Sequence, residues 1–460
     1  MTARERELAF DPIKPLVLKY SIPAIIAMMV NALYNVVDRF WIGQLNDVNA
    51  MSGIGLTAPL SNILLALMML GGLGATSLIS IRLGERRKQE AEVVLGNAMT
   101  MSIVVGIGAT LVGLPFLDRI LVTFGASPAT LPYAMGYMRI ILYGNVFNTI
   151  SFAMNHTIRG GGFPRRAAAS QLLGAGMNVV LDPIFIFTFG LGVAGAAWAT
   201  IISQFASAIF VMSFYFLKKS VVELKLINMP LKAEVVKQIT AIGVSSFAMQ
   251  IAASLVTVLA NRALRIQGGD LAIGAMTVIQ SLLIMVMMPV FGINQGLQPI
   301  LGFNYGARNY ERVQQAWRFG VMFATSIVVV GFAVMQLFPN QIISAFIKDV
   351  ELNRIGTEGI RIVMLMLPVI GFQIISTIYF TSIGKARISL LLSMLRQIIV
   401  LAPLYLILPP IFGITGVWMA MPIADLTATV ITAVLITREM RLLRGMIRQR
   451  DRELELAQEA

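Results

Sequence analysis

Long apolar segments follow one another through almost the whole chain of 460 residues, and they limit what it can fold into. A helix that crosses the hydrocarbon core of a bilayer needs about 20 mostly apolar residues. Stretches of this kind recur here between short segments rich in Gly, Pro, Asn or charge. We count twelve of them: 16–42, 54–81, 92–117, 131–158, 166–189, 193–217, 239–262, 272–300, 314–338, 356–382, 388–409 and 414–437. The sequence therefore predicts an all-α polytopic membrane protein with little chain left for a soluble domain.

Composition agrees with this prediction and excludes several kinds of chemistry. Hydrophobic residues make up 57% of the chain and charged residues 13%, whereas soluble domains average about 25% charged residues. Cysteine is absent and His156 is the only histidine, which excludes disulfides, thiolate metal sites and two-histidine zinc motifs. No GxxxxGK[ST] phosphate loop is present. We therefore expect no cofactor and no ATP hydrolysis by the chain itself.

The net charge of +13, from 36 Lys and Arg against 23 Asp and Glu, is concentrated in alternate loops. Basic residues cluster at 82–88, 159–166, 218–237, 308–318 and 385–387, and in the tail at 438–452. The positive-inside rule assigns such segments to the cytoplasm. Both termini are then cytoplasmic, as an even number of spans requires. The basic excess reflects topology, and no nucleic-acid partner is expected.

An internal repeat divides the chain into two halves. A shift of 222 positions aligns Gly74 with Gly296, Gly84 with Gly306, Arg86 with Arg308, and Gly162 with Gly384. Each half holds six spans, so both enter the membrane in the same direction and are related by a pseudo-two-fold axis along the membrane normal. We expect an N-terminal lobe at 1–217, a cytoplasmic linker at 218–238, a C-terminal lobe at 239–437 and a cytoplasmic tail at 438–460.

Polar residues inside the spans are few and fall on single helix faces. In the first span they stand at i, i+3, i+4 and i+7: Asn31, Tyr34, Asn35 and Asp38. Intramembrane acids usually face the protein interior or a wet cavity, and they mark ion or substrate paths. Asp38 could instead pair with its neighbour Arg39 at the outer boundary of the span.

A second polar group follows in the fifth and sixth spans. Asn178 and Asp182 form an i, i+4 pair, and Pro183 loosens the helix that carries them because it lacks an N–H donor. Thr200 lies at a similar depth in the next span. We therefore expect Asp38, Asn178, Asp182 and Thr200 to converge in the N-terminal lobe.

Two carboxylates in a low-dielectric site favour the uptake of a proton or a small cation, because desolvation and mutual repulsion penalise two negative charges. Carboxylate, amide and hydroxyl oxygens also suit sodium. The second half does not repeat this site, since the shift of 222 places Ala260 and Leu404 at the equivalent positions.

Other polar groups have several interpretations. Asn148, Phe152 and Gln280 could line a substrate cavity together with Asn31, Tyr34 and Asn35. We interpret Asp425 and Arg396 as a buried ion pair in preference to a second coupling site, and His156 as a structural hydrogen-bonding residue.

The chain resembles the multidrug and toxic compound extrusion (MATE) family, in its MepA-like prokaryotic branch. The resemblance rests on the segments 34–43, 74–85, 178–185 and 195–197, with 292–306 in the second half, and it extends over essentially the whole chain. It implies a twelve-helix antiporter with two six-helix lobes, not an enzyme. By resemblance, Asp38, Asn178, Asp182 and Thr200 form a cation site for H⁺ or Na⁺. Residues 243–262 and 361–382 lack the acids that another branch uses in its second lobe.

The resemblance also implies partners and a location. Substrates are expected to be cationic or amphipathic drugs, exchanged for protons or sodium by a monomer in a prokaryotic plasma membrane. Two alternatives come from other classes. A flippase for lipid-linked precursors would share the lobe plan but should have a more cationic cavity, and a membrane-embedded enzyme would use Asp38 and Asp182 as a catalytic pair, although no nucleophile or metal motif accompanies them.

Overall fold

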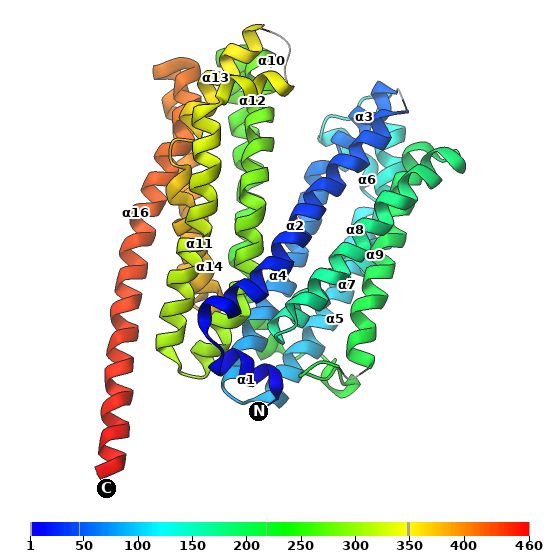
Figure 1. Cartoon of the computed structure of the whole chain (residues 1–460). Helices are drawn as coiled ribbons and strands as arrows, with labels where there is room; N and C mark the ends of the chain where they lie inside the picture. The colour runs from blue at the N-terminus through cyan, green and yellow to red at the C-terminus, as the bar shows by residue number, and fades with distance from the viewer. Residues whose placement is uncertain (1, 46, 218, 347–349, 460) are drawn as a thin grey trace.

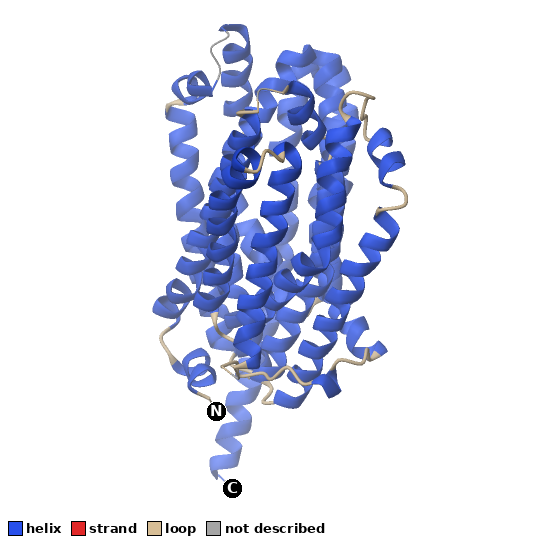
Figure 2. Cartoon of the chain, turned by 90° about the vertical axis from the view of Figure 1, so that its right-hand side faces the viewer, coloured by secondary structure: helices blue, strands red, loops and turns tan. Residues whose placement is uncertain are grey.

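The structure is a computed structural model that describes residues 2–45, 47–217, 219–346 and 350–459. Within those ranges all regular structure is helical (Figure 2). The first half of the chain forms α1 (Ala3–Phe10), α2 (Ile13–Gly43), α3 (Val48–Gly55), α4 (Ala58–Gly84), α5 (Lys88–Gly113), α6 (Leu117–Thr123), α7 (Leu131–Gly160), α8 (Pro164–Pro183), the π-helix η1 (Ile184–Thr188) and α9 (Gly192–Phe216). The second half forms the 3₁₀ helix η2 (Leu226–Asn228), α10 (Ala233–Gly306), α11 (Tyr310–Leu337), α12 (Pro339–Phe346), α13 (Val350–Val363), α14 (Leu367–Ser382), α15 (Ala386–Met394), the π-helix η3 (Leu395–Leu401) and α16 (Ala402–Glu459).

Each of the twelve predicted spans is largely helical, although 54–81, 92–117 and 356–382 each cross a short turn between two helices. Helices α10 and α16 are long because each contains a break between two spans. The break in α10 is Gly269, with φ +64°, and the break in α16 is Gly413, with φ +60°. Glycine enters this left-handed region at little cost because it has no Cβ. Among the described residues, nine helices are long and apolar enough to cross a bilayer, or ten if the bent pair 353–363 and 367–382 is one span. The stretch 386–450 counts once here but contains two of the predicted spans, 388–409 and 414–437. The predicted span 131–158 corresponds to α7, which is more polar and is not among the nine.

The internal repeat is visible in the backbone. Arg86 and Arg308, which the shift of 222 aligns, are the two non-glycine residues with positive φ in the described chain, at 62° and 58°. Each follows the C-terminal end of a helix that ends in glycine, α4 in one half and α10 in the other. Gly162 and Gly384 also share a positive φ, of 88° and 77°. Equivalent turns at equivalent positions support the predicted two-lobe architecture.

Glycines bring the two lobes into direct backbone contact. A Cβ on Gly84 would lie 2.0 Å from the carbonyl oxygen of Phe303, and one on Gly306 would lie 2.2 Å from that of Ile81. These two contacts are equivalent under the repeat, because each residue of one pair is 222 positions from its counterpart in the other. Only glycine permits such an approach. The interface between α4 and α10 therefore carries the pseudo-two-fold symmetry.

The two lobes converge at one end of the bundle and diverge toward the other (Figure 1). The close glycine contacts lie near the convergent end, in the second part of α4 and in the beginning and end of α10. Both chain termini lie at this same end (Figures 1 and 2), as an even number of spans requires. The lobes are therefore packed together on the side of the termini.

Helix α1 lies across the convergent end and contacts both lobes. Arg312, at the start of α11, donates from Nη2 to the carbonyl oxygens of Leu8 and Asp11, at 3.1 and 2.7 Å. On its other side, the guanidinium of Arg4 lies 5.1 Å from the centre of the Phe163 ring in the N-terminal lobe. The Leu8 side chain is buried. Helix α1 thus links the lobes in this conformation.

Replacing Arg312 by Ala should loosen α1, because two carbonyl oxygens lose a charged donor. We expect amide hydrogen exchange in residues 3–10 to become about ten-fold faster, measured by mass spectrometry. Arg318→Ala, which removes the same charge at an exposed position of the same helix, should leave the exchange unchanged. Equal protection of α1 in Arg312→Ala and wild type would contradict this assignment.

Arg396 and Asp425 form an ion pair in the C-terminal lobe. The Arg396 Nε donates to the Asp425 Oδ1 at 2.5 Å, joining η3 to α16, and the Asp425 side chain is buried. Asp425→Leu leaves a largely buried cation without its partner and should cost about 3 kcal/mol, seen as a lower temperature of thermal unfolding. The double variant Arg396→Met/Asp425→Leu should recover most of that loss. A double variant less stable than the single one would argue against a purely structural pair.

Candidate functional site

Three helices of the N-terminal lobe bring the predicted cation-coupling residues together. Helix α2 carries Asp38, α8 carries Asn178 and Asp182, and α9 carries Thr200. Helix α8 packs against both α2 and α9. Asn178, Asp182 and Thr200 are buried, and Asp38 is half-buried. These four residues, predicted from their spacing and depth, therefore share one site.

The Asn178 side chain connects the other two buried groups. With its amide oriented to satisfy both neighbours, Nδ2 donates to the Asp182 Oδ2 at 3.0 Å. The amide oxygen then accepts from the hydroxyl and the backbone N–H of Thr200, both at 3.3 Å. This arrangement fixes Asp182 relative to α9 although Pro183 and the π-helix η1 follow it directly.

The carboxyl groups of Asp38 and Asp182 lie close enough to interact with each other. Two carboxylates at this separation cannot both remain ionised without a proton or a cation between them. One Asp38 oxygen, Oδ1, is buried and has no hydrogen-bond partner among the described residues. The geometry can therefore hold one shared proton or one small cation.

Two tyrosines complete the site. Tyr34, predicted as a substrate contact, and Tyr137 on α7 both lie within hydrogen-bonding reach of Thr200 and close to both carboxyl groups. Tyr137 did not figure in the sequence prediction. Its depth in the membrane could have been used to predict it. Tyr137 lies six residues into the inward-running span 131–158, and Thr200 lies about seven residues into the inward-running span 193–217.

Among the other predicted substrate residues, Asn148, Phe152 and Gln280 are not joined to this cluster by any described contact. Asn31 is exposed, and the side chain of Asn35 lies outside the described residues. Asn148 is half-buried farther along α7, and Gln280 is half-buried on α10 in the other lobe. Phe152 packs toward Gly72 of α4. Their roles as substrate contacts remain predictions.

His156 differs from its predicted role as a hydrogen-bonding residue. Its Nδ1 is buried without a hydrogen-bond partner among the described residues. Its ring packs instead on Phe152, with 4.5 Å between the ring centres.

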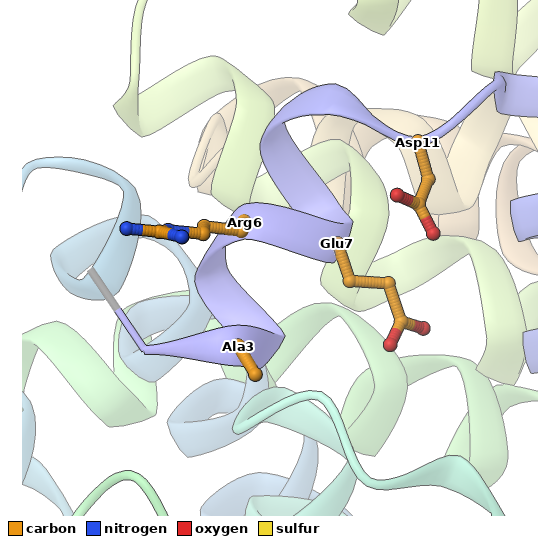
Figure 3. Close-up of a pocket in the computed structure, with 4 residues that line it drawn as sticks. All are labelled: Ala3, Arg6, Glu7 and Asp11. Atoms are coloured by element: carbon orange, nitrogen blue, oxygen red, sulfur yellow. The ribbon is translucent and has the colours of Figure 1, made fainter.

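Two surface depressions lie at the convergent end of the bundle, away from the carboxyl pair. One is lined by α1, where Glu7 and Asp11 project on one side of the helix and Arg6 on the other (Figure 3). The other lies between α1 and the turns that contain Arg86 and Arg308. Neither contains a predicted site residue.

Comparison with known proteins assigns the chain to a family. A family model described as MatE matches residues 23–184 and 241–406, so it covers both lobes and most of the chain. This chain belongs to the MatE family. It is a multi-pass membrane transporter and not an enzyme.

Individual relatives share nearly the full length of the MATE chain. It is 27% identical over 415 residues to the multidrug export protein MepA of Staphylococcus aureus strain MSSA476, covering 90% of this chain and 91% of that protein. A solved structure described as the outward-facing conformation of a multidrug resistance MATE transporter matches with a TM-score of 0.91 and 27% identity, over 97% of this chain and 99% of the other. A MATE structure in complex with MaL6 matches with the same TM-score and identity, over 97% and 100%.

Proposed function

We propose that this MATE transporter exports cationic or amphipathic compounds in exchange for protons, with sodium as the alternative ion. The observation that carries the proposal is the contact between Asp38 and Asp182 inside the N-terminal lobe. Its relatives that are named multidrug export proteins support the export of drugs. We assign it to a prokaryotic plasma membrane with both termini in the cytoplasm, because the basic loops accompany the termini.

The site is built to move helices when its occupant changes. Asp38 lies on α2 and Asp182 on α8, so a shared proton holds the two helices together, and its loss lets the carboxylates repel each other. Pro183 and η1 weaken α8 just beyond Asp182. A cation drives transport only if it binds the two conformations unequally, and helix movement at the site supplies that difference.

Alternating access follows from the way the lobes meet. They are closed at the end of the termini, which we assign to the cytoplasm, so this conformation corresponds to one open to the outside. A drug would bind when the lobes part at the closed end, and it would be released after they rock to the conformation described here. The likeness to an outward-facing MATE structure supports this assignment.

The donor set bears on which cation binds. The described chain has no group of three or more His, Asp or Glu residues placed to hold a metal ion. In the orientation that its neighbouring hydrogen-bonding groups favour, the Asn178 amide has its nitrogen toward Asp182, and a sodium ion at that carboxylate would require the opposite orientation. A proton shared by Asp38 and Asp182 requires no such change. We therefore favour coupling to protons.

Transport of a fluorescent cationic dye in proteoliposomes, with pH and sodium gradients imposed separately, tests the proposal. We expect the pH gradient to drive export. Export driven by neither gradient would refute antiport. Selective binding of an anionic lipid-linked precursor instead of the dye would indicate a flippase, and chemical turnover without movement of substrate would indicate an enzyme.

A further inference from the structure

An arginine lies almost completely buried between the two lobes. Arg159, on the last turn of α7, is 1% exposed. Its Nη2 donates to the Gln171 Oε1 of α8 at 2.9 Å, and its Nη1 donates to the Gln295 Oε1 of α10. Its Nε is buried without a hydrogen-bond partner among the described residues. The guanidinium is therefore bound by two neutral amide oxygens, one from each lobe.

The described acids on the helices around this guanidinium are engaged with other groups. On α5, which packs against α7, Glu90 pairs with Arg82 and Arg87, and Glu92 pairs with Lys88 and Lys225. Arg159 belongs to none of the ion pairs formed within the described residues. The neighbouring helix segments 20–37 of α2, 58–81 of α4, 192–216 of α9 and 271–306 of α10 contain no Asp or Glu. On α8 the single acid is Asp182, which is engaged in the site with Asp38.

A buried charge without a counter-charge is costly, and arginine does not escape the cost by losing its proton. Hydrogen bonds to Gln171 and Gln295 satisfy part of its donor capacity and none of its charge. Two more polar atoms are buried without partners among the described residues: His156 Nδ1, on α7 close to Arg159 in sequence, and Asn294 Oδ1, next to Gln295 on α10. Because the charge of Arg159 and its Nε donor have no partner in this conformation, we expect an anionic ligand to bind them in another conformation.

We propose that Arg159 is a binding subsite for a carboxylate group on the transported substrate. The proposal rests on the export function above and narrows it, since the preferred compounds would then be amphipathic and zwitterionic. Gln295 belongs to the opposite lobe, so its hydrogen bond to Arg159 breaks when the lobes part at the convergent end. The guanidinium then opens toward the side from which the substrate comes, with two donors free for a bidentate contact.

Closure of the lobes reverses this binding. The Gln295 oxygen returns to the guanidinium and takes the place of the carboxylate, so the substrate loses its anchor as the opposite side opens. Such competition makes the carboxylate bind the two conformations unequally, as transport requires.

A pair of dyes that differ in one group tests the subsite. Rhodamine 110 carries a free carboxylate, and rhodamine 123 is its methyl ester. In proteoliposomes, Arg159→Gln should lower rhodamine 110 export by about 10- to 100-fold, as expected for loss of a charged hydrogen-bonding partner, and leave rhodamine 123 export within about two-fold of wild type. Arg159→Lys should recover part of the loss. Arg165→Gln removes an exposed charge nearby and should affect neither dye.

The outcomes separate this subsite from the export function. Equal loss of both dyes in Arg159→Gln would show that Arg159 only holds the lobes together, and equal retention of both would show that it binds no carboxylate. If wild-type protein and Arg159→Gln both export the two dyes at the same rate, the subsite is refuted and the export function stands. If wild-type protein exports neither dye, the export function is refuted as well. Inhibition of rhodamine 110 export by phosphatidylglycerol, in wild type but not in Arg159→Gln, would identify a lipid phosphate as the anion instead.

Discussion

Asp182→Asn is expected to reduce gradient-driven export to the level of vesicles without protein. Asparagine keeps the size of the side chain and the possible contact with Asn178, but it cannot take up a proton or offer a negative charge to sodium. Without a cation that binds the two conformations unequally, an imposed gradient shifts no equilibrium. Dye export from proteoliposomes under an imposed pH gradient measures the effect.

Two controls make this result interpretable. Asp118→Asn makes the same chemical change at an exposed position on α6 and should export as wild type does. Asp182→Asn should still bind dye in detergent solution, since the change affects coupling and not the fold. Full export by Asp182→Asn would refute a coupling role for the carboxyl pair, and loss of dye binding together with export would indicate a folding defect at α8.

Gly74→Ala should have the second large effect, through the contact between lobes. A Cβ at position 74 would lie 2.1 Å from the carbonyl oxygen of Ile239 on α10, so the backbones of α4 and α10 must move apart. Overpacking of this kind costs about 1–3 kcal/mol, which shifts the equilibrium away from the closed end by roughly 5- to 150-fold. Export should fall because the outward-open conformation is reached less often.

The same helix offers a matched control for this substitution. A Cβ on Gly71, three residues before Gly74, would meet no atom within 4 Å, so Gly71→Ala should behave as wild type. Because the chain contains no cysteine, spin labels on Gln89→Cys and Gln315→Cys can report the separation of the lobes. A longer distance in Gly74→Ala and not in Gly71→Ala is expected. Unchanged distances in both would show that the glycine contact does not control the conformation.

The two lobes differ in how their buried acids are partnered. In the first lobe Asp38 and Asp182 lie next to each other, and neither forms an ion pair within the described residues, although Arg39 adjoins Asp38. The second lobe pairs its buried Asp425 with Arg396. This difference supports the coupling role that we propose for the first lobe and a structural role for the Arg396–Asp425 pair in the second.

Several features could be predicted because they depend on local pattern. Span lengths follow from bilayer thickness, and the repeat follows from glycines and arginines at a constant offset, which the equivalent φ values of Arg86 and Arg308 support. The convergence of Asp38, Asn178, Asp182 and Thr200 was predictable from spacing and depth. Intramembrane acids are so costly that they have few permissible positions.

Other features depended on how helices rotate and pack, which periodicity does not determine. Tyr137 belongs to the site because α7 turns that face toward Thr200. Gln280 and Asn148 have suitable chemistry, yet no described contact brings them to the cluster. His156, expected to form a hydrogen bond, meets an aromatic ring instead.

By itself the sequence determined the class of the protein, predicted twelve spans in two lobes, and indicated the four polar residues that converge in the first lobe. These features depend on the hydrophobicity and charge of individual residues and on their spacing, which the sequence gives directly. Only the tertiary structure decided which backbones touch across the lobes, that Asp38 and Asp182 lie next to each other, and that Arg159 is buried between Gln171 and Gln295. These depend on distances between segments far apart in the chain, and those distances are set when the helices pack together.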